Sequence, residues 1–322
     1  MSKPLLSVAM CTYNGSRYIR EQLESIATQT RLPDELVVCD DGSQDDTMAA
    51  LRQFAGTVPF NVRIFENANR LGPAKNFERV IGLCEGDIIA LSDQDDVWRP
   101  EKLAVLSEAL DQHPAAVYAF SDARMVDESR AMIGRSLWDA VGLRSRVCEF
   151  SGLGQVEILL RRNLIPGAAM AFRAGFRGAV LPVPSGWMHD YWIALIGSVL
   201  AYGVPINEVL FDYRRHSSQA CGWRKKTFGQ VIRDSLRSEP GEAWAKLDAF
   251  RSARSRVLTR TGSAVDRAER IALLEDKEAH LLRRARARSA TGLDRVIGVL
   301  TEAATGRYRR FSRSWSSIIR DL

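Results

Sequence analysis

Short apolar runs alternate with amphipathic stretches through the N-terminal third of the chain. The runs have the length of buried strands, and the stretches between them repeat apolar residues every three or four positions, as a helix does. Strands that alternate with helices are typical of an α/β fold with a largely parallel sheet. The predicted strands are 5–11, 36–39, 62–65 and 87–91, and the predicted helices are about 17–29 and 45–54.

A later apolar stretch, 191–206, is interpreted as one buried helix. It is shorter than the roughly 18 residues of a membrane span, and Pro205 interrupts it. The N-terminal segment lacks the long apolar region and cleavage site of a signal peptide. Five cysteines without a C-x-x-C spacing exclude a zinc ribbon and argue against a secreted disulfide framework. We therefore expect a cytoplasmic protein without an integral membrane segment.

Charge divides the chain into two parts. Residues 222–322 carry 23 Lys and Arg against 12 Asp and Glu, a net charge of +11. Residues 1–221 carry 22 against 27, a net charge of −5. This asymmetry, with helical apolar spacing after position 270, predicts a basic helical extension over 222–322 behind a first domain over 1–221.

Polar clusters follow three of the predicted strands. They are Thr12-Tyr13-Asn14, Asp40-Asp41 and Ser92-Asp93-Gln94-Asp95-Asp96. Ligands of parallel α/β sheets bind at the carboxyl ends of the strands, so these clusters are expected to converge on one crevice. The P-loop, dinucleotide-binding, zinc-protease and nucleophile-elbow motifs are all absent, which argues against those enzyme classes.

Asp93 and Asp95 form a D-x-D arrangement after an apolar strand. Two carboxylates directed at one point suit Mg²⁺ or Mn²⁺, with a substrate diphosphate completing the coordination shell. The alternative is a solvated acidic loop that caps the next helix. Because Asp40 and Asp41 follow a neighbouring strand, the pattern favours the metal site.

The ordered motifs resemble those of family-2 glycosyltransferases. The resemblance covers roughly residues 5–221 and implies a GT-A (Rossmann-like) fold, a mixed, mainly parallel sheet flanked by helices, and inverting sugar transfer. The Ser-Asp-Gln-Asp-Asp-Val-Trp form is similar to the rhamnosyltransferase-like branch, which implies dTDP-L-rhamnose as donor. The segments that carry the resemblance are Val8–Asn14, Gln29-Thr30, Val37–Thr47, Asn69–Gly72 and Ser92–Trp98.

The same resemblance implies roles on the donor side. Asp41 would accept a hydrogen bond from the imide of a pyrimidine base, although an Asx-turn that closes the strand is an alternative role for its side chain. Asp95 would be the principal metal ligand, with Asp93 near the ribose and phosphates. The nucleotide pocket would be lined by Thr12, Tyr13 and Asn14, with Asp40 supporting its loop. The implied donor is a dTDP- or UDP-linked sugar.

On the acceptor side the resemblance implies that Asp190 is the general base. An acceptor hydroxyl must lose its proton as it attacks the anomeric carbon, and a nearby carboxylate can take that proton. A helix N-cap is the alternative role for Asp190. Gly167 would let a sugar approach the backbone, and Trp187 and His189 would face the acceptor, although His189 could equally be a packed neighbour.

The segment Tyr213-Arg214-Arg215-His216 resembles a family segment that closes over the donor. It implies His216 as a metal ligand, with an exposed loop residue as the alternative, and Arg214 or Arg215 as a contact of the diphosphate. Gln219 stands where relatives often have Asn. The Gln-x-x-Arg-Trp signature of processive synthases is absent, which favours single-sugar transfer to a glycan or lipid-linked glycan.

Residues 307–320 place aromatic and aliphatic side chains on one stripe between arginines. Such a helix either packs its aromatic face on the catalytic domain or lies on an anionic membrane surface, which would make the protein peripheral on the inner face. No nucleic-acid motif is present. Two further hypotheses compete with the transferase: a nucleotidyltransferase on a similar sheet and a non-catalytic glycan-assembly subunit. The stripe consists of Tyr308, Phe311, Trp315, Ile318 and Ile319.

Overall fold

A computed structural model describes residues 3–217, 219, 240–262, 265–312 and 316–322. Four buried or half-buried parallel strands form its N-terminal part, in the order β3-β2-β1-β4. These strands and the helices between them confirm the predicted alternation. The strands are β1 (Leu6–Thr12), β2 (Glu35–Asp40), β3 (Asn61–Glu66) and β4 (Ile88–Ser92), and the helices are α1 (Ile19–Ala27), α2 (Thr47–Ala55) and α3 (Pro73–Leu83).

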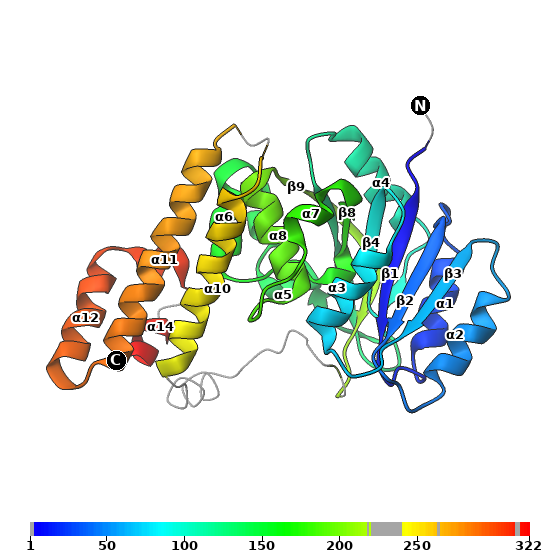
Figure 1. Ribbon diagram of the computed structural model, residues 1–322, viewed down its shortest axis with the longest axis horizontal. Helices are drawn as coiled ribbons and strands as arrows, with labels where there is room; N and C mark the ends of the chain where they lie inside the picture. Colours follow the sequence, from blue (N-terminus) through cyan, green and yellow to red (C-terminus); the bar gives the residue numbers. More distant parts are fainter. Residues whose placement is uncertain (1–2, 218, 220–239, 263–264, 313–315) are drawn as a thin grey trace.

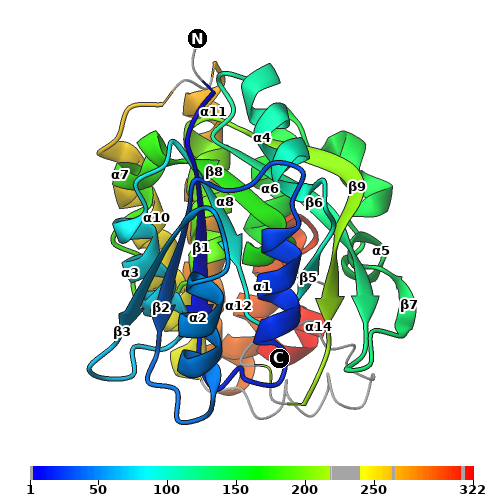
Figure 2. The ribbon, with the colours of Figure 1, turned by 90° about the vertical axis from the view of Figure 1, so that its right-hand side faces the viewer.

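The helices cover both faces of this sheet. Helices α1 and α2 lie on the outer face, and α3 lies on the face turned toward the rest of the molecule (Figure 2). The strand order explains this arrangement, because right-handed crossovers in opposite directions along a sheet place their helices on opposite faces. The carboxyl ends of β1, β2 and β4 therefore meet at one edge.

The sheet continues as β4-β8-β6-β9-β5, with β7 paired to β6. Strand β8 runs antiparallel to both neighbours, and β6 pairs parallel with β9, so the sheet is mixed, with its longest registers parallel. The elements of this half are β5 (Val97–Trp98), α4 (Lys102–Gln112), β6 (Tyr118–Val126), β7 (Met132–Ser136), α5 (Leu137–Val141), η1 (Arg144–Glu149), α6 (Gly152–Arg161), η2 (Gly167–Ala169), β8 (Met170–Arg173), η3 (Ala174–Phe176), α7 (Arg177–Val180), α8 (His189–Leu200) and β9 (Gly203–Arg214).

The interpretation of 191–206 as one helix is wrong. Helix α8 ends at Leu200 and strand β9 begins at Gly203, so Pro205 lies in a strand beside β6. A β-carbon at Gly203 would lie only 2.1 Å from the ring of Tyr118. The change from helix α8 to strand β9 therefore depends on the close contact of Gly203 with Tyr118, which lies far away in the sequence. Among the described residues, no helix is both long and apolar enough to cross a membrane.

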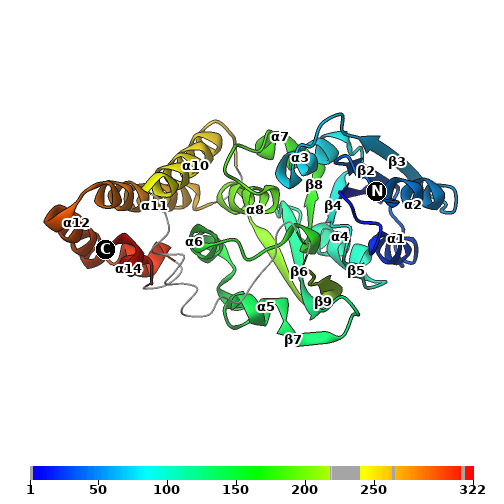
Figure 3. The ribbon, with the colours of Figure 1, turned by 90° about the horizontal axis from the view of Figure 1, so that it is seen from below.

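The C-terminal helices extend the molecule at the end opposite α1 and α2 (Figures 1 and 3). They share the main apolar core with the α/β part, because Leu247, Leu274 and Phe311 belong to the same buried cluster as the sheet. The predicted division at 221/222 lies outside the described residues. The helices are α10 (Pro240–Leu258), α11 (Arg267–Ser289), α12 (Gly292–Ala304), α13 (Arg307–Phe311) and α14 (Ser316–Asp321).

The aromatic stripe of 307–320 is in part a packing surface. Tyr308 is 4% exposed and Phe311 is 1% exposed, so neither side chain is available to a membrane. Tyr308 packs with Ala287 and Val299, and Phe311 joins the main core. Trp315 lies outside the described residues. Phe311 thus fits the alternative in which the stripe packs on the α/β part, whereas Tyr308 packs on α11 and α12 of the C-terminal helices.

Candidate active site

One cavity of about 1470 Å³ collects most of the predicted site residues. Its wall begins at the carboxyl ends of β1, β2 and β4, continues over the start of α8, and reaches α10 and α11. A cavity of this size exceeds the roughly 300–1,000 Å³ of a typical small-molecule pocket. It therefore has room for two substrates side by side.

Asp40 and Thr12 hold the strand ends together. The buried carboxylate of Asp40 accepts the hydroxyl of Thr12 at 2.6 Å, and the backbone N–H and hydroxyl of Ser43 at 2.7 and 2.6 Å. It also accepts the N–H of Gly42. The carboxylate is thus used inside the protein, which agrees with the predicted supporting position of Asp40. The Asx-type turn belongs to Asp40 and not, as the alternative had it, to Asp41.

Asp41 faces the cavity with a fixed orientation. Its carboxylate accepts the backbone N–H groups of Leu71 and Gly72 at 2.7 and 2.8 Å and the side-chain amide of Asn67 at 2.7 Å. Three donors from the segment that leads into α3 fix both oxygens of this carboxylate. Asp41 therefore presents a rigid hydrogen-bond acceptor to the cavity.

Tyr13 and Gln94 connect β1 to the D-x-D turn. The Gln94 amide accepts the N–H of Tyr13 at 2.8 Å and donates to its carbonyl at 3.0 Å. The Arg70 guanidinium lies 3.9 Å from the centre of the Tyr13 ring, and both residues line the cavity. Asn14 is exposed and bonded to Ser43 and Gln44, outside the cavity wall. The expectation that Asn14 lines the pocket is therefore wrong in this structure.

Two of the three predicted metal ligands touch. His216 Nε2 lies 2.7 Å from Asp95 Oδ2, and the side chains of both residues are largely buried. Asp93 also lines the cavity, and burial, followed by the charges of Asp95 and Asp190, raises the pKa of Asp93 to about 7. Within the described parts of the chain, no three His, Cys, Asp or Glu side chains surround one metal position. Of the three predicted metal ligands, Asp95 and His216 are in contact, and the Asp93 carboxylate lies nearby.

This pair is compatible with a hard divalent cation. Mg²⁺ and Mn²⁺ both prefer carboxylate oxygen, Mn²⁺ also accepts imidazole nitrogen, and Mg²⁺ commonly takes only one or two protein carboxylates beside substrate phosphates and water. Asp95 and His216 provide one ligand of each kind on the cavity wall. Asp93 adds negative charge that a cation would offset.

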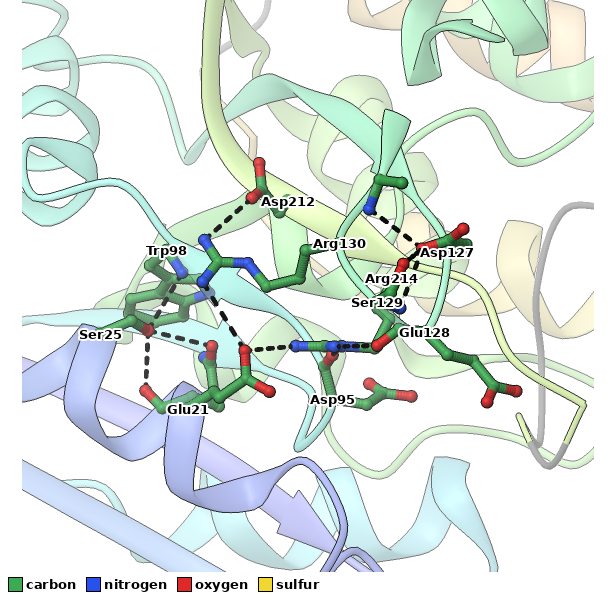
Figure 4. Close-up of polar contacts among 12 residues, drawn as sticks. Glu21, Ser25, Asp95, Trp98, Asp127, Glu128, Ser129, Arg130, Asp212 and Arg214 are labelled. Carbon is green, nitrogen blue, oxygen red and sulfur yellow. Dashed lines mark hydrogen bonds and ion pairs between the residues drawn. The ribbon is translucent and has the colours of Figure 1, made fainter. Parts of the chain in front are cut away.

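Arg214 is directed away from the cavity, which corrects its expected contact with a diphosphate. Its guanidinium is 1% exposed and donates to the Glu21 carboxylate at 2.9 Å and to the Asp95 and Glu128 carbonyls at 2.9 and 2.8 Å (Figure 4). Arg214 therefore fixes the D-x-D turn from behind. Arg215 donates its backbone N–H to Val126 and does not line the cavity.

A buried lysine lies behind the same turn. Lys102 is fully buried on α4, where its ammonium donates to the carbonyl of Ala168 and lies 4.1 Å from the ring centres of both Trp98 and Phe211. Burial lowers the pKa of Lys102 to about 7, and the charges of Asp96 and Asp93 oppose that shift. Lys102 was not among the residues predicted from the sequence.

Asp190 lies on the cavity wall in the first turn of α8. Met188 occupies the N-cap position of α8 without a side-chain hydrogen bond, so the N-cap alternative for Asp190 is wrong. The carboxylate accepts the N–H of Gly167 at 3.2 Å and that of Tyr191 at 2.6 Å, with the Asn163 side chain as a further partner. Burial raises the pKa of Asp190 to about 6, against these hydrogen bonds, which lower it.

His189 and Trp187 flank this carboxylate differently. The His189 ring stacks on Phe77 at 3.8 Å, and among the described residues neither ring nitrogen has a hydrogen-bond partner although both are buried. Burial lowers the pKa of His189 to about 3, so the ring is neutral. The indole N–H of Trp187 donates to the Ala249 carbonyl on α10, and its ring lies between those of Tyr191 and Phe250.

Comparison with known proteins identifies the family. The family model "Glycosyl transferase family 2" matches residues 7–179, more than half of the chain. The chain belongs to glycosyltransferase family 2. The match includes strands β1, β2 and β4 and the D-x-D turn at one end of the cavity, and it supports the expectation of a glycosyltransferase.

The solved structures that resemble this glycosyltransferase-family chain show a GT-A fold. TarS of S. aureus in complex with UDP superposes with a TM-score of 0.60 over 98% of this chain and 89% of that one, at 15% identity. The mannosyltransferase PcManGT from Pyrobaculum calidifontis, in complex with GDP-Man and Mn²⁺, gives 0.54 over 100% and 86%, at 17% identity. The expected fold class is confirmed.

Relatives in sequence cover part of the chain. An uncharacterized protein of Mycobacterium tuberculosis is 28% identical over 220 residues, which are 66% of this family-2 chain and 59% of that relative. The dTDP-rhamnosyl transferase RfbG of Shigella flexneri is 39% identical over 98 residues, 29% of this chain and 34% of that one. The match to the mycobacterial relative thus spans less than two thirds of that protein's length.

Proposed function

We propose that this family-2 protein transfers a single sugar from a nucleotide diphosphate to an acceptor hydroxyl, with inversion at the anomeric carbon. The observation that carries the proposal is the position of Asp190, whose carboxylate lines the same cavity as Asp41, Asp93 and Asp95. A direct displacement needs a base for the attacking hydroxyl, and a carboxylate within reach of that hydroxyl can be this base.

Asp190 acts as the general base. The acceptor hydroxyl attacks the anomeric carbon, its proton passes to the Asp190 carboxylate, and the bond between that carbon and the diphosphate oxygen breaks. A pKa of about 6 leaves the carboxylate ionised at neutral pH and more basic than an ordinary aspartate. The N–H of Gly167 holds one carboxylate oxygen in place, so the base has a defined direction of approach.

The donor occupies the end formed by Thr12, Tyr13 and Asp41. Asp41 is held by backbone N–H groups, so it offers an acceptor with a defined direction to the imide N–H of a uracil or thymine base. The partial match to a dTDP-rhamnosyl transferase favours dTDP-L-rhamnose. The neighbours crystallised with UDP and GDP-Man support a nucleotide donor more generally.

A divalent cation, Mg²⁺ or Mn²⁺, would be held by Asp95 and His216, with Asp93 beside it. When bound, it would stabilise the negative charge that develops on the leaving diphosphate. The residues behind the pair keep it in position, because Arg214 bonds the Asp95 carbonyl and Gln219 bonds the Arg214 carbonyl. The PcManGT structure with Mn²⁺ supports this assignment.

The acceptor is proposed to be a surface glycan or a lipid-linked glycan. The chain is proposed to consist of a catalytic domain over 1–221 and a basic extension over 222–322. Support for two functional parts comes from the cavity, whose acceptor end is closed by α10 and α11. The α/β part alone would leave that end open.

Thermal stability with dTDP, UDP or GDP, each with and without Mn²⁺, tests the proposal. A nucleotide at about 100 times its Kd adds about 2.7 kcal/mol to the free energy of unfolding and raises the melting temperature. A rise in melting temperature that is largest with dTDP and requires Mn²⁺ supports dTDP-L-rhamnose as the donor. A rise that is largest with UDP or GDP would mean that the donor sugar is linked to that nucleotide instead. The His216→Ala protein is the matched control and should lose the Mn²⁺ dependence.

The outcome that contradicts the proposal is the absence of a shift with every nucleotide. A non-catalytic subunit would then be the better hypothesis. If nucleotide binds, product analysis by NMR of the anomeric configuration tests inversion. Retention of configuration would overturn the single-displacement role of Asp190.

A further inference from the structure

Helix α12 turns its apolar side chains away from the protein. Its buried residues are Val299 and Glu302, so a carboxylate takes half of the buried positions, whereas a surface helix normally directs an apolar stripe toward the core. The outward positions repeat at three and four residues, as one face of a helix does. They form the α12 stripe, which consists of Leu293, Val296, Ile297 and Leu300, with exposed fractions of 73%, 37%, 52% and 57%.

No described element covers the α12 stripe. The helix packs on α11, α13 and α14 with its other side, where Val299 lies against Ala287 and the Glu302 carboxylate bonds His280. In Figures 1 and 3, α12 forms the outer end of the molecule, opposite the α/β part. Contiguous apolar side chains that are left exposed on a surface mark a contact with a membrane or with another protein.

The segment that contains α12 is strongly basic. Residues 283–322 have ten arginines, no lysine and three carboxylates, a net charge of +7. Two of the arginines form ion pairs with carboxylates outside this segment. The carboxylates of Glu302 and Asp321 are buried and bonded to other side chains, so Asp294 is the one exposed carboxylate among the described residues of the segment. Positive charge thus exceeds negative charge in this part of the protein.

Two arginines place this charge beside the α12 stripe. Arg286 is exposed on α11 and directly precedes Ala287, the residue that packs on α12. Arg295 lies within α12 and donates to the backbone carbonyl of Asp321, a neutral group. Neither arginine forms an ion pair with a described residue. Cations next to exposed apolar side chains are the combination that binds anionic headgroups and the acyl chains below them.

We propose that the α12 stripe docks on an anionic phospholipid membrane, with Arg286 near the lipid phosphates. A second copy of the chain is the weaker candidate, because self-association through this face would bring two basic segments together, and like charges oppose that contact. The inference goes beyond the proposed function, since it concerns membrane binding alone. Helices α11 and α14, on which α12 packs, also line the cavity, so docking would bring that end of the cavity close to the membrane.

Flotation of the full chain with lipid vesicles tests the proposal. One set of vesicles is pure phosphatidylcholine, and the other contains equal parts of phosphatidylcholine and phosphatidylglycerol. We expect the protein to float with the anionic vesicles and to bind the neutral ones at least about tenfold more weakly, because the arginines find no anionic lipid there. Added salt should weaken binding to the anionic vesicles, since it screens this attraction.

Substitutions in the α12 stripe identify the surface. Ile297→Ser and Leu300→Ser should each reduce binding to the anionic vesicles about fivefold or more, because each removes a side chain from the apolar contact. Leu32→Ser is the matched control, because Leu32 is 40% exposed in the connection between α1 and β2. All three side chains are exposed, so the melting temperature should not change.

A second pair of variants tests the charge. Arg286→Gln should reduce binding to the anionic vesicles about fivefold at low salt and leave binding to the neutral vesicles unchanged. Arg52→Gln is its control, because Arg52 is exposed on α2 and forms no ion pair with a described residue. An equal loss in both variants would mean that net charge alone attracts the protein, which contradicts docking through α12.

The absence of binding to anionic vesicles, or binding that is unchanged in both stripe variants, overturns the proposal. Sedimentation velocity without vesicles tests the second copy. A dimer that dissociates in Ile297→Ser, together with no vesicle binding, would replace the membrane with self-association. Flotation needs neither nucleotide nor sugar, so a failure of the proposed transfer activity leaves this result unaffected.

Discussion

Gly167 donates its backbone N–H to the carboxylate of Asp190 at 3.2 Å. The absence of a side chain at Gly167 makes this approach possible, because a β-carbon there would lie 2.8 Å from His189 Nε2. The His189 ring is stacked on Phe77 and buried, so it cannot turn aside easily. The position of the Asp190 carboxylate thus depends on a glycine in the segment before β8.

Gly167→Ala should therefore reduce transfer while leaving the donor site intact. The added methyl group must displace either the ring or the η2 segment, which moves the carboxylate from its direction of attack. We expect kcat to fall about tenfold or more, since small errors in alignment are costly. Gly175→Ala is the control, because no heavy atom lies within 4 Å of the β-carbon added there. Equal activity of both variants would contradict the positioning role.

The pH profile of transfer should report Asp190. Only the ionised carboxylate accepts a proton, and burial raises its pKa to about 6. We expect kcat/KM to be level above that pH and to fall about tenfold per pH unit below it. Initial rates from pH 5 to 8 at saturating metal measure this directly. A rate that is unchanged down to pH 5 would mean that another group takes the proton.

Asp190→Asn should stabilise the protein at neutral pH while abolishing most transfer. The folded state raises the pKa of Asp190 from 3.8 to about 6, so ionisation of this group opposes folding as the pH rises through that window. Asparagine removes this cost. We expect the variant to melt higher than the wild type at pH 7.5, with the difference shrinking toward pH 4. A melting temperature of the variant below that of the wild type at pH 7.5 would contradict the expected direction of the stability change.

The N-terminal strands and the acidic residues at their ends could be predicted because their signals are local. Strands β1, β2 and β4 are continuous apolar runs, and Asp41 and Asp93 follow them directly. Strand β6 was missed because it carries Asp122 and Arg124 among its apolar residues. The Asp122 carboxylate is balanced by Arg144, a contact between separate elements that no local pattern announces.

The errors in the site have the same origin. Arg214 looked like a phosphate ligand in sequence, but its partners Glu21 and Glu128 are 193 and 86 positions away. Lys102 was missed because a lysine at the start of a helix is ordinarily exposed. Its partner Ala168 lies 66 positions along the chain. Residue type and spacing placed Asp41, Asp95 and Asp190 on the cavity wall, but they did not reveal that Arg214 is used inside the protein.

Lys102→Met should destabilise the fold more than an ordinary surface lysine substitution. Methionine keeps the length of the side chain but leaves the Ala168 carbonyl without this donor and the acidic cluster of Asp93 and Asp96 without this buried cation. Removing one partner of a buried charge cluster costs roughly 3 kcal/mol. Urea unfolding measures the change, with the exposed Lys246→Met as the control. A loss equal to that of the control would mean that Lys102 is only a packing residue.

His189→Phe should separate acceptor binding from folding. Both ring nitrogens are buried and, among the described residues, have no hydrogen-bond partner. Because neither nitrogen stabilises the fold, phenylalanine should preserve the stack on Phe77 and leave the melting temperature unchanged or higher. If a ring nitrogen bonds the acceptor, the KM of the acceptor should rise about tenfold while the KM of the donor changes little.

His280 is the matched control, since this buried histidine bonds Glu302 and Ser312. His280→Phe should destabilise the protein by about 1–3 kcal/mol. Unchanged acceptor kinetics in His189→Phe would assign His189 to packing alone.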